Sequence, residues 1–344
     1  MKLSDFHYEL PERLIAQEPV SSRDESRLLI LHRASGRIEH RRFFNIIDYV
    51  SKGDVLVIND SKVIPARIIG KKKTGGKVEV FLSRILSSTK NSQTWECLLN
   101  GRYLKNGLEI IFGNHFTATL EERIGDVWVI TFNCTGVTFQ RRLEKYGQVP
   151  LPPYIKKISK KYKEQYQTVY ADSKHTGSVA APTAGLHFTP RLIKELKNKG
   201  VIIKTITLHV GLGTFLPVRE ACIKKHQMHS EWVEVRQEVL QEIKAARKRG
   251  KRVIAVGTTT VRALEAAWQA TPSKDFRGLV NIFIFPPYTF KSIDGLITNF
   301  HLPQSTLLML VAALVGRKTL LQAYIEAVDK EYRFFSFGDA MLVL

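Results

Sequence analysis

The fold of this chain is decided by the stretch Arg252-Val-Ile-Ala-Val-Gly-Thr-Thr-Thr-Val-Arg-Ala-Leu-Glu265. Its first five residues form the apolar run of a buried strand, and residues 261–270 have the composition of a helix. A strand that passes through a short turn into a helix is typical of an α/β domain. The neighbouring segments alternate in the same way, with a predicted strand over 201–210 and predicted helices after Thr189 and over 235–249.

The pattern changes between about residue 63 and about residue 146. Short strand-like runs follow one another there, separated by glycine-containing turns and with no helix between them. They cover residues 77–82, 95–99, 108–112, 115–120 and 127–132. This spacing indicates an antiparallel sheet or small barrel. We therefore predict a main α/β domain over 1–62 and 151–344, interrupted by an inserted β domain over 63–150.

The charge of the chain is unusual. Its 52 Lys and Arg residues exceed its 32 Asp and Glu residues, which gives a net charge of +20. A surplus of this size favours a polyanionic partner, either nucleic acid or an acidic membrane. The chain has 344 residues, of which 44% are hydrophobic, and this excludes general disorder.

Cysteine usage and hydropathy indicate a cytoplasmic protein. Cys97, Cys134 and Cys222 are too few and too scattered for a disulfide framework or a thiolate zinc site. The N-terminus lacks the apolar core of a secretory signal. The longest apolar run, residues 307–315, is about half of what a bilayer requires, so we expect a buried helix and no membrane partner.

Several loops rich in small residues are candidate binding sites. The turn Gly257-Thr-Thr-Thr260 offers hydroxyls and free N–H groups at a helix start, suited to an anion or to ribose, although one Thr could simply cap the helix. Residues 177–188 and 298–306 are similar in character. The run 209–215 lacks the third glycine of a dinucleotide or methyltransferase loop. His226, His229 and Glu231 do not amount to a zinc site, and we predict no metal.

Basic residues are clustered along the chain and are interleaved with tyrosines. Such clusters suit a surface that follows RNA phosphates, and the tyrosines suit stacking on unpaired bases, although any one of them could be a core aromatic. The clusters are Lys71–Lys73, Lys156, Lys157, Lys160, Lys161 and Lys163, and residues 247–252; the tyrosines are Tyr154, Tyr162, Tyr166 and Tyr170.

Long motifs along nearly the whole chain resemble one family, the S-adenosylmethionine:tRNA ribosyltransferase-isomerases of queuosine biosynthesis. The matching runs are Phe6-His-Tyr-Glu-Leu-Pro11, Asn59-Asp-Ser-Lys-Val-Ile-Pro-Ala-Arg67, Gly177-Ser-Val-Ala-Ala-Pro-Thr-Ala-Gly-Leu-His-Phe188, His209-Val-Gly-Leu-Gly-Thr-Phe215, Gly257-Thr-Thr-Thr-Val-Arg262, Asp294-Gly-Leu-Ile-Thr-Asn-Phe-His-Leu-Pro303 and Tyr332-Arg-Phe-Phe-Ser-Phe-Gly-Asp-Ala-Met341. Lys62 departs from the pattern, because the family often has Arg there.

The resemblance implies a barrel-like α/β main domain interrupted by a smaller antiparallel β-barrel. It also implies transfer and isomerisation of the ribosyl group of S-adenosylmethionine onto the 7-aminomethyl group of 7-aminomethyl-7-deazaguanine at the tRNA wobble position. The product is epoxyqueuosine tRNA, and adenine and methionine leave. S-adenosylmethionine is then a co-substrate, no prosthetic group is needed, and we expect a monomer.

The resemblance also assigns roles to residues. The base that removes a proton beside the sulfonium is expected to be His187, His209 or His301, with Asp60 as the competing carboxylate. The expected S-adenosylmethionine contacts are Thr183, Phe188, Gly211, Gly213, Thr214, Phe215, Thr258, Thr259, Thr260, Arg262 and Asn299. The expected tRNA contacts are Lys62, Arg67, Tyr154, Lys156, Lys157, Lys160 and Lys161.

Two other functions remain open at this stage. A non-catalytic RNA-binding module would share the basic surface but would not bind S-adenosylmethionine. An RNA methyltransferase would use the same co-substrate but would release S-adenosylhomocysteine rather than adenine and methionine, and the missing glycine fingerprint disfavours it.

Overall fold

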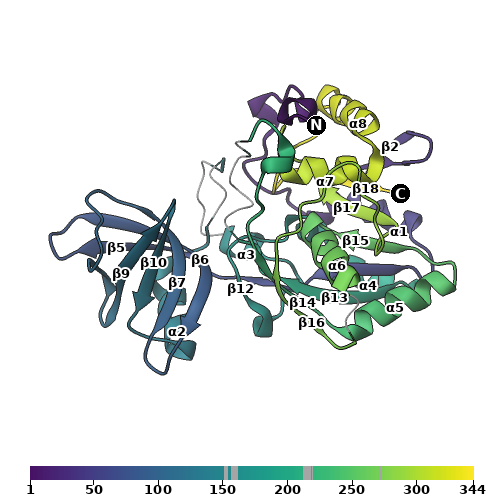
Figure 1. Cartoon of the computed structure of the whole chain (residues 1–344). Coiled ribbons are helices and arrows are strands. Elements are labelled where there is room, and N and C mark those ends of the chain that lie inside the picture. Colours follow the sequence, from purple (N-terminus) through teal and green to yellow (C-terminus); the bar gives the residue numbers. More distant parts are fainter. Residues whose placement is uncertain (151–153, 156–161, 212–217, 219, 271–272) are drawn as a thin grey trace.

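The computed structural model describes residues 1–150, 154–155, 162–211, 218, 220–270 and 273–344. A small β-barrel and a larger α/β part lie side by side in Figure 1, with the barrel at the left. The chain enters the α/β part first, passes through the barrel, and returns to complete the α/β part.

Six antiparallel strands form the barrel. Their order is β5 (Arg67–Lys72), β6 (Lys77–Ser88), β7 (Gln93–Asn100), β10 (Val127–Phe132), β9 (Phe116–Ile124) and β8 (Glu109–Gly113). The barrel closes because β5 also pairs with β8, at Lys71 and Ile111. Alternate residues point inward, as in β10, where Trp128, Ile130 and Phe132 are buried.

Helix α2 (Gly136–Tyr146) follows the last barrel strand and covers its interior. Its Phe139 packs edge-on against Phe132 and stacks on Trp95, with ring centroids 5.0 and 5.6 Å apart. The short strand β11 (Gly147–Gln148) then pairs with β5 and ends the barrel segment. The barrel core also contains Val179, which belongs to the segment that follows the barrel in the sequence.

The α/β part is built on a nine-stranded mixed sheet. The strand order is β16 (Phe276–Val280), β14 (Glu231–Val235), β13 (Ile202–Leu208), β3 (Val55–Asn59), β15 (Val253–Val256), β17 (Gly295–Asn299), β18 (Ala340–Val343), β1 (Arg27–Leu31) and β2 (Ile38–Arg42). The four central strands, β13, β3, β15 and β17, are parallel. The short strands β4 (Lys62–Val63) and β12 (Thr176–Ser178) pair separately.

Helices cover both faces of this sheet, which explains why its central strands are continuous apolar runs. Val55 and Val57 of β3 pack into a core that includes residues of α5 (Gln237–Lys248), α6 (Thr258–Ala270), α7 (Thr306–Val315) and α8 (Arg317–Asp329). Leu56 and Ile58 pack into a second core with α1 (Ile46–Tyr49) and α4 (Pro190–Asn198). The predicted fold class, an α/β domain interrupted by an antiparallel β-barrel, is confirmed.

Helix α7 contains the long apolar run of the sequence, and α8 follows it directly. No single helix in the described residues is long and apolar enough to cross a membrane; α7 and α8 pass that test only when taken together, and they meet at an angle of 115°. Leu308 and Met309 of α7 are fully buried in the core beside the sheet, as expected for the apolar run 307–315.

Candidate active site

The carboxyl ends of the parallel strands form one edge of the main sheet. After β3 the chain crosses to β13 on one side, and after β13 it crosses back over β3 to β15 on the other side. Helix α4, after β12, lies on one face of the sheet and α5, after β14, lies on the other. Ligands of open α/β sheets bind outside the strand ends where the strand order reverses in this way.

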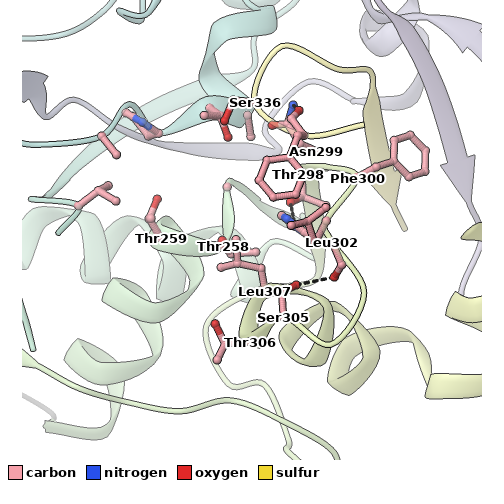
Figure 2. Close-up of a pocket in the computed structure, with 18 of the residues that line it drawn as sticks. Thr258, Thr259, Thr298, Asn299, Phe300, Leu302, Ser305, Thr306, Leu307 and Ser336 are labelled. Atoms are coloured by element: carbon pink, nitrogen blue, oxygen red, sulfur yellow. Dashed lines mark hydrogen bonds between the residues drawn. The ribbon is translucent and has the colours of Figure 1, made fainter. Parts of the chain in front are cut away.

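A cavity of about 360 Å³ lies at this edge. Part of its lining comes from the turn after β15 and from the end of β17 with the segment that follows it (Figure 2). The rest includes the loop before α4 and two tyrosines near the barrel connection. The residues are Tyr154, Tyr166, 180–184, Val210, Val218, 257–259, 298–307, Phe335 and Ser336. The size and the mixed polar and apolar lining suit a small organic ligand.

The threonine turn supplies two of its three hydroxyls to the cavity. Gly257 adopts a φ of +89°, which is easy only for glycine, and the chain then enters α6 directly. Thr258 and Thr259 line the cavity, and Figure 2 shows both at the start of that helix. Thr260 does not line it, because its hydroxyl is turned back and donates to the Val256 carbonyl at 2.6 Å.

Asn299 ends β17 and has one polar atom to spare. Its Nδ2 donates to the Phe335 carbonyl at 3.1 Å and lies 3.1 Å from His187 Nε2. Because a carbonyl oxygen only accepts, the amide nitrogen is fixed on that side, and His187 Nε2 must accept its second hydrogen. Asn299 Oδ1 is buried and has no hydrogen-bond partner in the described residues. It is an acceptor available to a ligand hydroxyl.

His187 lies behind Asn299 and outside the cavity. With Nε2 accepting, its Nδ1 carries the proton and donates to Ser26 Oγ at 2.8 Å. The ring stacks on Phe43 at 5.0 Å. Burial, together with smaller effects from the charges of Arg333 and Arg23, lowers the pKa of His187 to about 3. The side chain is therefore neutral at physiological pH and orients the Asn299 amide.

His301 is the one predicted base that lines the cavity in the described part of the chain. Its Nε2 lies 2.8 Å from Thr298 Oγ1, and its backbone N–H donates to the Tyr324 hydroxyl at 3.1 Å. Tyr8 donates to the His301 carbonyl. The contact with Thr298 holds the ring in place. Burial lowers the pKa of His301 to about 3, so the ring is neutral at physiological pH.

The other two predicted bases lie elsewhere. His209 follows β13 and lines a second cavity, between the sheet and the barrel, where it stacks on Trp232 with ring centroids 5.1 Å apart. Asp60 follows β3, and its carboxylate accepts from Thr207 Oγ1 at 2.7 Å and lies 3.1 Å from His175 Nδ1. Asp60 lines neither of these two cavities.

The remaining predicted S-adenosylmethionine contacts do not all lie at the cavity. Thr183 lines the cavity, whereas Phe188 is fully buried against Phe43 in the second core. Arg262 is buried in an ion pair with Glu231, which also accepts from the Gly211 N–H at 3.0 Å. Gly211 lines the second cavity. Gly213, Thr214 and Phe215 lie outside the described residues.

The predicted tRNA contacts are less well defined. Tyr154 lines the cavity, where its hydroxyl is hydrogen-bonded to Ser336 Oγ and its ring meets Phe335 edge-on. Lys62 belongs to β4, and Arg67 of the barrel is ion-paired with Glu79. Lys156, Lys157, Lys160 and Lys161 lie outside the described residues.

Most of the lining residues were not among the predicted contacts, and Tyr166, Ser336 and Gln304 are examples. Tyr166 is fully buried and its hydroxyl has no partner in the described residues. Ser336 and Gln304 complete the wall, and Gln304 adopts a φ of +60°. Ser336 lies in the run 332–341 that carries the family resemblance, and Tyr166 was among the tyrosines interleaved with the basic clusters; these positions were the available signals. In the described residues, no group of three or more His, Cys, Asp or Glu side chains could hold a metal.

An open α/β sheet with a cavity of mixed polar and apolar lining at its switch point is the architecture of a protein that binds a small organic molecule. The chain belongs to the family described as queuosine biosynthesis protein, whose model matches residues 3–343. Like its curated relatives, it is a transferase.

The relatives are similar over their full lengths. Two proteins named S-adenosylmethionine:tRNA ribosyltransferase-isomerase, from Thermotoga petrophila and Desulforamulus reducens, are 50% and 51% identical, with all of both chains covered. A crystal structure of S-adenosylmethionine tRNA ribosyltransferase from Thermotoga maritima is similar with a TM-score of 0.58 and 40% identity; the match covers 99% of this chain and all of the other.

Proposed function

We propose that this enzyme transfers and isomerises the ribosyl group of S-adenosylmethionine onto the 7-aminomethyl group of 7-aminomethyl-7-deazaguanine at the tRNA wobble position. Epoxyqueuosine tRNA forms, and adenine and methionine leave. The family and the names of its full-length relatives support the reaction class. The observation that carries the proposal is the cavity at the strand ends, with two buried oxygen atoms that have no hydrogen-bond partner in the described part of the chain.

S-adenosylmethionine would occupy this cavity. Ribose hydroxyls are donors that suit Asn299 Oδ1, and the Thr258 and Thr259 hydroxyls at the start of α6 suit the carboxylate of the methionine group. The hydroxyl of Tyr166, which also lines the cavity, is a further group without a hydrogen-bond partner in the described residues. Ligand binding would satisfy buried polar atoms that are costly to leave unpaired, at about 1–3 kcal/mol each.

His301 is the proposed base, because it is the predicted base that lines the cavity. The sulfonium acidifies the adjacent 5′ carbon, and a neutral imidazole can accept the proton released from it. Loss of that proton would drive departure of adenine by opening of the sugar ring, after which the neutral amine of the tRNA base attacks. Thr298 would hold the ring through Nε2 and leave Nδ1 to act.

The direct test is release of free adenine from S-adenosylmethionine in the presence of tRNA that contains 7-aminomethyl-7-deazaguanine. The wild-type enzyme should release adenine and methionine in equal amounts and form no S-adenosylhomocysteine. His301→Ala should lower the turnover number by about 100-fold or more. The matched control is His7→Ala, which removes a histidine that is exposed at the surface. Near wild-type turnover of His301→Ala would exclude His301 as the base.

A further inference from the structure

A second and larger cavity separates the barrel from the main sheet. Its volume is about 780 Å³, more than twice that of the cavity at the strand ends. The barrel contributes residues of β6, β7 and α2, and the main part contributes His209, Gly211 and residues 228–232. We call this cavity the interdomain cleft.

Each side of the interdomain cleft carries a pair of flat, stacked rings. On the barrel side Trp95 stacks on Phe139, with an angle of 19° between the ring planes. On the sheet side His209 stacks on Trp232, with an angle of 20°. All four residues line the cleft. Flat aromatic walls suit a planar ligand, because nucleobases stack on aromatic side chains.

The same cleft contains buried polar atoms that the chain leaves unpaired. They are Trp95 Nε1, Gln93 Oε1 and His209 Nδ1, and none has a hydrogen-bond partner in the described residues. Trp95 is only 7% exposed. One atom is a donor, one is an acceptor and the imidazole nitrogen can be either. A ligand that satisfies them must itself offer both donors and acceptors, as the edge of a purine does.

The interdomain cleft and the strand-end cavity lie on opposite sides of the same two segments. Gly177 lines the cleft and Ala180 lines the strand-end cavity; likewise His209 lines the cleft and Val210 the strand-end cavity. The two segments are joined by a hydrogen bond from the Val179 N–H to the Val210 carbonyl, at 2.9 Å. A ligand in one cavity is therefore separated from the other by two short stretches of chain.

We infer that the interdomain cleft binds the unstacked purine-type base of the tRNA substrate, the base that carries the accepting amine. The inference rests on the proposed function, which places S-adenosylmethionine in the strand-end cavity. Trp232 packs against one face of the base, and Trp95 Nε1 and Gln93 Oε1 bind its edge. The base would then lie next to the segments that contain Val179 and Val210, with the co-substrate on their other side.

The test measures binding and does not depend on turnover. Two labelled anticodon stem–loop RNAs are titrated by fluorescence anisotropy, one with 7-aminomethyl-7-deazaguanine at the wobble position and one with an abasic site there. Trp95→Phe removes the Nε1 donor but keeps an aromatic ring. It should weaken binding of the first RNA about tenfold and leave binding of the abasic RNA unchanged.

The matched control is Trp128→Phe, the same change at another buried tryptophan of the barrel that does not line the cleft. It should bind both RNAs as the wild type does. A second variant, Trp232→Leu, removes the aromatic ring on the sheet side of the cleft. It should show the same selective loss, of about tenfold or more. Its control is Trp268→Leu, on α6 and outside the cleft.

Two results would overturn the inference. One is equal binding of the first RNA by Trp95→Phe and Trp128→Phe. The other is an equal loss for both RNAs, which would mean that the cleft contacts another part of the RNA. Failure of the proposed function is recognised separately, because it appears as absence of adenine release by the wild-type enzyme.

Discussion

Asn299 links the strand-end cavity to a histidine that the cavity does not contain. His187 fixes the Asn299 amide from behind, and the Oδ1 atom stays buried with no partner among the residues that the structure describes. At the scale of single residues, His187 is thus a positioning residue. His301, the proposed base, lines the cavity directly. The two histidines share a depressed pKa but differ in what they contact.

Removal of the Asn299 side chain should weaken S-adenosylmethionine binding. Asn299→Ala deletes the unpaired acceptor and should raise the dissociation constant by about tenfold, the value of one hydrogen bond to a ligand hydroxyl. Isothermal titration calorimetry measures it directly. Asn133→Ala, on the barrel and outside the cavity, is the control. Unchanged affinity of Asn299→Ala would show that Oδ1 does not contact the ligand.

The buried histidines should make folding stability depend on pH. The fold holds His187 and His301 neutral down to a pKa of about 3, whereas the unfolded chain protonates at about 6.5. Stability is therefore complete above pH 6.5 and falls as the pH drops from 6.5 towards 3. At pH 5 each histidine should have removed about 2 kcal/mol.

Urea unfolding at pH 7 and pH 5 tests this dependence. His187→Asn should lose about 2 kcal/mol less than the wild type between the two pH values, whatever its stability at pH 7. His7→Asn, at an exposed position, should keep the wild-type difference. If His187→Asn also keeps it, His187 is not held neutral by the fold.

At the scale of elements, the sequence was sufficient to predict strands and turns wherever neighbouring residues determine the structure. The run 252–260 predicted a strand, a turn and a site, and Thr258 and Thr259 do line the cavity. Thr260 could not be separated from them, because its bond to Val256 depends on the direction of its side chain. Phe188 and Arg262 do not line this cavity for a related reason. Phe43 packs against Phe188 and Glu231 pairs with Arg262, and both partners are distant in sequence.

Closure of the barrel depends on Gly70 of β5. A methyl group at this position would lie 2.5 Å from Ile110 Cγ2 and 2.8 Å from the Phe112 ring, both in the packed core. Gly70→Ala should therefore destabilise the barrel by about 1–3 kcal/mol. Gly278→Ala of β16, where a methyl group would meet nothing within 4 Å, is the control. Equal urea midpoints for the two variants would contradict this account of closure.

At the scale of the whole molecule, the net charge of +20 should govern tRNA binding. If Lys156, Lys157, Lys160 and Lys161 contact phosphates, their change to glutamate should weaken tRNA binding. It should also reduce the slope of log affinity against log salt by about 0.7–0.9 per lost contact. S-adenosylmethionine binding should not change.

The control for this variant changes the net charge equally at other sites. Lys194, Lys197, Lys318 and Lys330 are exposed on or beside α4 and α8, and they are changed to glutamate together. Binding of tRNA over a range of salt concentrations compares the two variants. If both lose the same affinity, overall charge rather than the lysine cluster is responsible.

The central claim is that the strand-end cavity holds S-adenosylmethionine, and filling that cavity tests it most directly. Thr259→Phe places a ring beside the turn after β15, within the lining. Calorimetric titration with S-adenosylmethionine should show one site in the wild type, at least a tenfold loss of affinity in Thr259→Phe, and wild-type affinity in Trp95→Phe. Wild-type affinity in a folded Thr259→Phe variant would contradict the claim.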